Sequence, residues 1–104
     1  MFCSGQIGLD PKTQDLVNGG IEQETHQVMK NLAAVLKQAH YTFEHVVRCD
    51  IFLTELADFQ IVNEIYGSYF KQEVKPSRQT VEVSKLPKGA SIEISCIATL
   101  NAER

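Results

Sequence analysis

The 104-residue sequence lacks the features that mark membrane-spanning, secreted and nucleic-acid-binding proteins. No apolar run approaches the roughly 20 residues that a membrane-spanning helix needs. The N-terminal stretch MFCSGQIG has no basic segment followed by an apolar core, so it does not resemble a signal peptide. Lys and Arg number 10 against 13 Asp and Glu, and the basic residues are scattered, which disfavours a nucleic-acid partner. We therefore expect one cytoplasmic domain, residues 1–104.

The sequence also has few cysteines and lacks the common motifs of catalytic and metal-binding sites. Three cysteines, Cys3, Cys49 and Cys96, form an odd set without Cys-x-x-Cys or Cys/His ligand spacing, which favours reduced thiols over a disulfide scaffold. Cys49 and Cys96 lie in apolar, strand-like runs, and we interpret them as buried hydrophobes rather than reactive nucleophiles. The sequence contains no phosphate-binding loop, nucleophile elbow or metal motif.

The sequence does contain an alternation of strand-like and helix-like patterns. Alternating apolar residues predict strands over 2–8, 46–53, 78–84 and 90–100, and apolar stripes at helical spacing predict helices over 21–39 and from 58 to about 70. The buried stripe of the second helix should comprise Phe59, Val62, Tyr66 and Phe70. We expect His40 to end the first helix in a left-handed conformation, and Asp58 to cap the second. This order of elements predicts an α+β domain with both helices on one face of a sheet.

The last two predicted strands carry charged residues in unusual places. If the LPKG stretch closes them into a hairpin, Glu82 lies opposite Glu93, with Arg78 further along the same face. This face, turned away from the helices, also carries Ile97, and a mixed polar and apolar face is typical of an assembly surface. The pattern alone favours the simpler interpretation, a solvated or edge-protecting strand face.

Three stretches, FCSGQIGLDPKT, DFQIVNEIYGSYF and PSRQTVEVSKLPKGASIEI, resemble in order and spacing the reactive-intermediate deaminase family, also called the YjgF/YER057c/UK114 family. The resemblance implies a chorismate-mutase-like α+β fold with a mixed sheet. It also implies a homotrimer whose sheets form a central barrel with clefts between subunits. The implied activity is hydrolysis of 2-iminopropanoate and 2-iminobutanoate, which pyridoxal-phosphate-dependent dehydratases release, to 2-oxo acids and ammonia without a metal or cofactor.

The resemblance also assigns roles to particular residues. Arg78 would hold the substrate carboxylate, which a guanidinium matches with two charge-assisted hydrogen bonds, and Glu93 would position or activate the attacking water. The backbone around Gly5 and Gln6 would line the cleft. Asn63 would lie near the site, although a polar residue beside an apolar stripe can equally serve to satisfy backbone groups.

The sequence differs from the family pattern in two places. Gln79 follows Arg78 where the family usually has a smaller residue, which would narrow the pocket. The resemblance implies about 25 preceding residues, with a Gly-Pro-Tyr-Ser stretch whose tyrosine lines the site and a strand that covers the edge of residues 2–8.

Two other functions are alternatives to imine hydrolysis. The chain could instead be a non-catalytic trimer that binds small carboxylates through Arg78. An endoribonuclease or translation inhibitor is the weaker alternative, because the charge balance is acidic.

Overall fold

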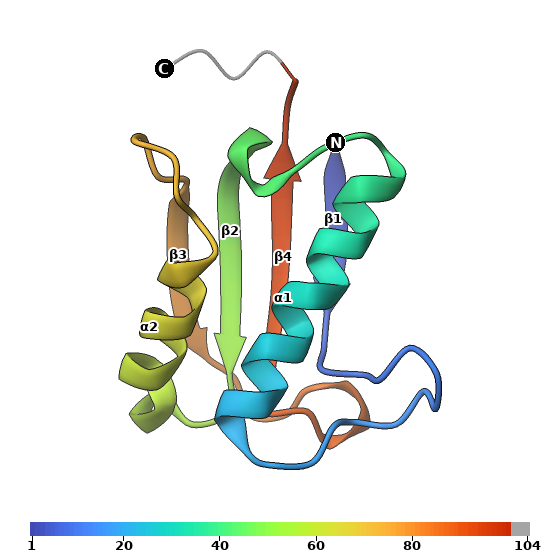
Figure 1. Ribbon diagram of the computed structural model, residues 1–104. Coiled ribbons are helices and arrows are strands. Elements are labelled where there is room, and N and C mark those ends of the chain that lie inside the picture. Colours follow the sequence, from blue (N-terminus) through green and yellow to red (C-terminus); the bar gives the residue numbers. More distant parts are fainter. Residues whose placement is uncertain (101–104) are drawn as a thin grey trace.

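Two helices cover one face of a four-stranded sheet in the computed structural model, which describes residues 1–100 (Figure 1). The main elements are β1 (Phe2–Gln6), α1 (Ile21–Gln38), β2 (Val46–Leu53), α2 (Phe59–Ser68), β3 (Ser77–Glu82) and β4 (Ile92–Ala98). The strand order is β1-β4-β2-β3, with β2 and β3 parallel and the other pairs antiparallel. The prediction of an α+β domain with a mixed sheet and both helices on one face is confirmed. Within residues 1–100, no helix is long and apolar enough to cross a membrane.

The first helix forms and ends as its sequence predicts. Val28, Leu32 and Leu36 recur at helical spacing and are buried against the sheet. At the other end His40 has a φ of 65°, and the Tyr41 N–H donates to the Leu36 carbonyl at 2.9 Å. The left-handed residue thus turns the chain so that the Leu36 carbonyl, which also accepts from the Ala39 N–H at 3.0 Å, gains a second donor.

The second helix departs from the prediction at both ends. Asp58 occupies the N-cap position, but its side chain makes no capping hydrogen bond. The helix ends at Ser68, two residues before Phe70. Phe59, expected on the buried stripe, is 38% exposed, whereas Val62 and Tyr66 are buried. The exposed position of Phe59 places its ring at the side of the domain where Arg78 lies.

The predicted hairpin of the last two strands is wrong. β4 lies between β1 and β2, and β3 pairs with the far side of β2, so that β2 separates the two strands (Figure 1). The LPKG stretch belongs to a longer connection with a 3₁₀ turn, Pro87–Gly89, in which Lys88 has a φ of 57°. Two antiparallel neighbours satisfy both edges of β4, and α2 provides the crossover that a parallel β2-β3 pair requires.

Buried thiols form a row across the middle of the sheet. Cys3 pairs with Cys96, and Cys96 pairs with Cys49 across the next strand, so all three lie side by side under the helices. Burial raises the pKa of Cys49 to about 11 and also raises the pKa of Cys96. All three cysteines are free. The interpretation of Cys49 and Cys96 as core hydrophobes is confirmed.

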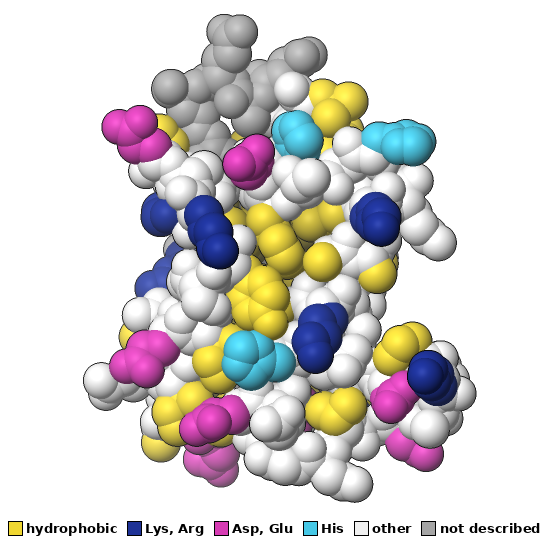
Figure 2. Space-filling model, viewed as in Figure 1, with side chains coloured by type: hydrophobic (Ala, Val, Ile, Leu, Met, Phe, Trp, Pro, Cys, Tyr) yellow, Lys and Arg dark blue, Asp and Glu magenta, His cyan; other side chains and the backbone are white. Residues whose placement is uncertain are grey.

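The two sides of the sheet differ in character. Hydrophobic side chains fill the space between the two helices on the covered side (Figure 2). On the other side, no described element packs over the strands. That side carries an Arg48–Asp50 ion pair with an N–O distance of 3.0 Å and several partly or largely exposed apolar side chains: Phe2, Phe52, Val81 and Ile97. We call this side the open face.

Candidate functional site

Arg78 lies on edge strand β3 and points toward the helices. It pairs in register with Cys49, whose buried side chain lies under the helices, so the two residues share a face of the sheet. The guanidinium carbon lies 5.3 Å from the centre of the Tyr66 ring and 5.7 Å from that of the Phe59 ring, both in α2. These cation–π contacts hold the guanidinium at the edge of the domain. No hydrogen-bonding or ion-pair partner of Arg78 lies among the described residues, so its donors are available to a ligand.

A cavity of about 270 Å³ opens beside Arg78. Buried Tyr66, Phe70 and Pro76 supply apolar surface, and the Tyr66 and Phe70 ring centres lie 4.7 Å apart. The remaining lining residues are Asn63, Gly67 and Lys75. Lys75 donates to the Phe70 carbonyl at 2.6 Å, and Arg78 lies beside the apolar surface, an arrangement that suits a small ligand with a carboxylate and an apolar remainder. The structure therefore brings together Arg78 and Asn63, two of the predicted site residues.

Glu93 lies elsewhere, on the open face of β4. It alternates with buried Ile92 and Ile94, and it pairs with Phe52 of β2. Its side chain lies against Gly5 of β1: a β-carbon at position 5 would come within 2.7 Å of the Glu93 Cδ. Gly5 does not have a positive φ, so the close approach of Glu93 is the feature here that requires glycine. The structure thus brings together Gly5 and Glu93, a second pair of the predicted site residues.

The backbone just before Glu93 is firmly held. The buried Glu24 carboxylate accepts hydrogen bonds from the Ser91 N–H at 2.6 Å and the Ile92 N–H at 3.3 Å. The Ser91 carbonyl in turn accepts from the Thr54 N–H at 3.1 Å. Charge-assisted bonds to backbone N–H groups are among the stronger ones in proteins. They attach the start of β4 to both α1 and the end of β2, which limits where the Glu93 side chain can lie.

Arg78 and Glu93 do not share a face, contrary to the prediction. In the β2 register Arg78 pairs with Cys49 and Glu93 with Phe52, and positions three apart in a strand point to opposite sides. Thr80 and Glu82 share the helix side with Arg78, whereas Glu93 and Ser95 lie on the open face. Glu82 is not opposite Glu93: it pairs with Leu53, and its carboxylate accepts from the Leu56 N–H at 2.8 Å.

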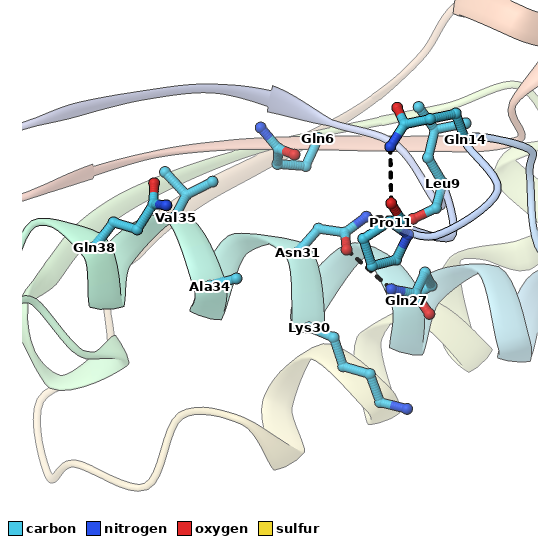
Figure 3. Close-up of a pocket in the computed structure, with 10 residues that line it drawn as sticks. All are labelled: Gln6, Leu9, Pro11, Gln14, Gln27, Lys30, Asn31, Ala34, Val35 and Gln38. Atoms are coloured by element: carbon cyan, nitrogen blue, oxygen red, sulfur yellow. Dashed lines mark hydrogen bonds between the residues drawn. The ribbon is translucent and has the colours of Figure 1, made fainter.

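Gln6 lines a separate hollow of about 530 Å³ between β1 and α1 (Figure 3). It pairs with Ile94, so its side chain lies on the helix side of β1, opposite to Glu93. Asn31 of α1 holds the adjoining loop by donating to the carbonyls of Ile7 and Leu9 at 3.0 and 2.9 Å. Lys30 extends away from Gln6 (Figure 3). The side chain of Gln6 does not join either half of the predicted site.

The sequence reasoning placed Tyr66 and Phe70 in the core but missed them as walls of the cavity, and it missed Gly67, Lys75 and Pro76. The signal was present in part, because Asn63 and Gly67 are four residues apart on a helix and share one of its faces. No group of three or more His, Cys, Asp or Glu side chains within residues 1–100 is placed to hold a metal ion. Of the predicted site residues, Arg78 offers a guanidinium that can pair with a carboxylate, and Glu93 offers a separate carboxylate that can accept a proton.

The chain is similar in sequence and in fold to known proteins. The sequence profile of the family described as endoribonuclease L-PSP matches residues 1–100. Protein DfrA of Myxococcus xanthus is 53% identical over 93% of this chain and 73% of its own length. The human protein named 2-iminobutanoate/2-iminopropanoate deaminase is 44% identical over 94% of this chain and 71% of its own. A crystal structure described as a putative endoribonuclease from Thermotoga maritima superposes with a TM-score of 0.93 at 42% identity, covering 98% of this chain and 80% of that one.

Proposed function

Because the chain belongs to the endoribonuclease L-PSP family, which includes the reactive-intermediate deaminases, we propose that it hydrolyses small 2-imino acids to 2-oxo acids and ammonia. The observation that carries the proposal is Arg78, an exposed guanidinium held on two aromatic rings at the mouth of a small apolar cavity. Relatives at 43–45% identity are named 2-iminobutanoate/2-iminopropanoate deaminase. Both named substrates are single carboxylates with a short apolar side chain.

In this proposal Arg78 binds the substrate carboxylate. The two parallel N–H groups of a guanidinium match the two oxygens of a carboxylate. The rings of Tyr66 and Phe59 hold the guanidinium in place, so that less conformational entropy is lost on binding. The imine carbon, one bond from the carboxylate, then takes a fixed position relative to Arg78. Fixing that position is a large part of what a hydrolysis with an already electrophilic carbon needs.

Glu93 supplies the proton transfer. As the water oxygen bonds to the imine carbon, the carboxylate accepts a proton from the water and passes it to the nitrogen, so the C=N bond becomes a C–N single bond. Glu93 then removes the proton of the new hydroxyl group. The C–N bond breaks, its electron pair leaves with the nitrogen, and the nitrogen takes that proton and departs as ammonia. Proton transfer by one positioned carboxylate is worth about 10²–10⁴ in rate.

Arg78 and Glu93 meet in one site only if they come from different chains. In each chain they lie on opposite sides of the sheet, separated by β2. We propose that the open faces of three chains pack together, which covers Phe52 and Ile97 and brings Glu93 of one chain to the Arg78 cavity of its neighbour. Exposed apolar residues around a partly buried polar centre are typical of such an interface. Light scattering should therefore report a trimer.

The direct test is imine hydrolysis. An L-amino-acid oxidase generates 2-iminopropanoate from alanine or 2-iminobutanoate from 2-aminobutanoate in the presence of semicarbazide, which traps the imine. Active protein competes for the imine and lowers the rate of semicarbazone formation, whereas heat-denatured protein leaves it unchanged. A native trimer that binds 2-oxobutanoate without lowering that rate would contradict the enzyme and favour a non-catalytic carboxylate-binding protein.

A further inference from the structure

Glu24 is a buried carboxylate in the first turn of α1, beside the start of β4 (Figure 1). Within residues 1–100, no Lys, Arg or His side chain forms an ion pair with it. A carboxylate that is removed from water is costly unless hydrogen bonds replace its hydration. The hydrogen bonds that Glu24 accepts therefore indicate what this residue does.

Those hydrogen bonds come from the backbone at the start of β4. The Glu24 Oε2 accepts from the Ser91 N–H at 2.6 Å and from the Ile92 N–H at 3.3 Å. β1 pairs with β4 only as far as Ile94, so the Glu24 carboxylate bonds N–H groups that the pairing with β1 does not reach. Removing the carboxylate would take this partner from the buried Ile92 N–H, which is destabilising.

Glu24 is also held by the segment that follows β1. A β-carbon at Gly8 would lie 2.8 Å from the Glu24 Cγ and 3.0 Å from the Glu24 carbonyl oxygen. Gly8 does not have a positive φ, so the close approach of Glu24 is what requires glycine there. Gly5, earlier in the same segment, gives room to Glu93 in the same way. Glu24 and Glu93 are thus placed against one stretch of chain, on which both depend for space.

We propose that Glu24 is a positioning residue: by fixing the backbone one and two positions before Glu93, it determines where the Glu93 carboxylate lies, without touching the substrate. The inference rests on the proposed imine hydrolysis, in which Glu93 transfers the protons. A displacement of about 1 Å in a reacting group can lower a rate by about 100-fold. Arg78, which binds the substrate in that proposal, lies on the other side of the sheet, so Glu24 should affect kcat rather than affinity.

The test compares wild type with Glu24→Ala, Glu24→Gln and Asn31→Ala in the hydrolysis of 2-iminopropanoate. Glu24→Ala should lower kcat by about tenfold or more and leave KM within about twofold. Glu24→Gln keeps an acceptor oxygen at the same reach, so its kcat should stay within about threefold of wild type. Asn31→Ala is the matched control, because Asn31 also joins α1 to the backbone by two hydrogen bonds, but to the carbonyls of Ile7 and Leu9 rather than to β4. It should lower Tm and leave kcat within about twofold.

A double variant separates positioning from a general loss of stability. Glu24→Ala is combined with Glu93→Gln, and turnover is measured at a raised protein concentration. The double variant should stay within about twofold of Glu93→Gln, because the proton acceptor that Glu24 positions is already absent. Tm should nevertheless fall by a similar amount in both backgrounds, since the same backbone hydrogen bonds are lost.

Three results would overturn the inference. Wild-type kcat in Glu24→Ala would mean that Glu93 keeps its place without Glu24. An equal fall in kcat in Asn31→Ala would mean that lost stability, rather than position, lowers the rate. A further tenfold loss in the double variant would mean that Glu24 acts independently of Glu93. If Glu24→Ala does not fold, Glu24→Asp, which is one methylene shorter, takes its place with the same expected results. If wild type does not hydrolyse 2-iminopropanoate, the proposed function fails and the inference with it, an outcome distinct from the other three, which all need an active wild type.

Discussion

Arg78 and Glu93 lie on opposite sides of one sheet: Arg78 is paired with Cys49 on the helix side, and Glu93 is paired with Phe52 on the open face. The intervening strand β2 carries both partners, and their separation by three positions sets the opposite directions of the two side chains. Neither residue can move to the other side without breaking the strand pairing. A site that uses both must therefore be formed by two chains.

Because Arg78 and Glu93 of one site would come from different chains, mixing variants of the two residues should restore activity. In the proposed trimer, the Arg78→Ala and Glu93→Gln variants should each be nearly inactive. Trimers refolded from an equal mixture should recover activity, because a site between an intact Arg78 and a neighbour's intact Glu93 is complete; random assembly makes about one quarter of the sites complete. The measurement is imine hydrolysis before and after co-refolding. If the co-refolded mixture is no more active than the separate variants, each site does not combine Arg78 and Glu93 from different chains, and the proposed assembly is wrong.

Replacing Arg78 should impair substrate binding more than folding. Arg78→Ala removes two charge-assisted hydrogen bonds, each worth about 1.5–3 kcal/mol, so kcat/KM should fall by about 100-fold or more. Arg78→Lys should also lose at least about tenfold, because an ammonium lacks the planar fork. Steady-state kinetics and thermal unfolding measure the two effects, with the exposed loop variant Lys85→Ala as control. A fully active, trimeric Arg78→Ala protein would exclude the anchoring role.

Glu93→Gln should separate proton transfer from binding. The amide keeps the shape of the carboxylate but cannot accept a proton in the same way, so kcat should fall by about 10²–10⁴. Calorimetric affinity for 2-oxobutanoate should change little. Glu82→Gln is the matched control, because Glu82 lies on the helix side and caps the Leu56 N–H. An equal fall in kcat in both variants would show that the activity depends on the overall negative charge rather than on a carboxylate at the position of Glu93.

Gly5→Ala should displace the Glu93 carboxylate. The added β-carbon would lie 2.7 Å from the Glu93 Cδ, closer than van der Waals contact permits. Because Gly5 is exposed and has no positive φ, we expect Tm to change little while kcat falls by about tenfold or more from the shifted carboxylate. Ser4→Ala, at the adjacent exposed position, controls for the strand. Wild-type kcat in Gly5→Ala would mean that Glu93 acts from another position.

Cys49 should make the folded state less stable at alkaline pH. Its thiol pKa is raised from 9.0 to about 11 by burial, so the folded state favours the neutral thiol. That contribution is complete below pH 9 and is lost as the pH rises toward 11, by up to about 2–3 kcal/mol. Urea unfolding at pH 8, 9 and 10, at one protein concentration, should show a steeper loss of the free energy of unfolding for wild type than for Cys49→Ala. Parallel curves for the two proteins would contradict the raised pKa.

Local features of this protein could be predicted well from the sequence. The buried positions Val28, Leu32 and Leu36 follow from a repeat of 3.6 residues, and the left-handed His40 follows from the position where that repeat ends. The alternation of Ile92, Glu93 and Ile94 placed Glu93 on the face away from its apolar neighbours. Each of these depends on the backbone geometry within one element, which neighbouring residues determine.

The tertiary structure alone decided which strands are neighbours and which way Arg78 points. Ser77–Glu82 contains no buried residue, so alternation within it could not indicate which of its sides meets the helices. That was decided when β3 paired with β2 in parallel, in the register of Arg78 with Cys49, and when β4 entered between β1 and β2. Sequence alone determined which residues could share a side of each strand, because side chains alternate between the two sides within a single strand. Strand order and register depend on hydrogen bonds and packing between segments far apart in the chain, and these divided the predicted site between two faces.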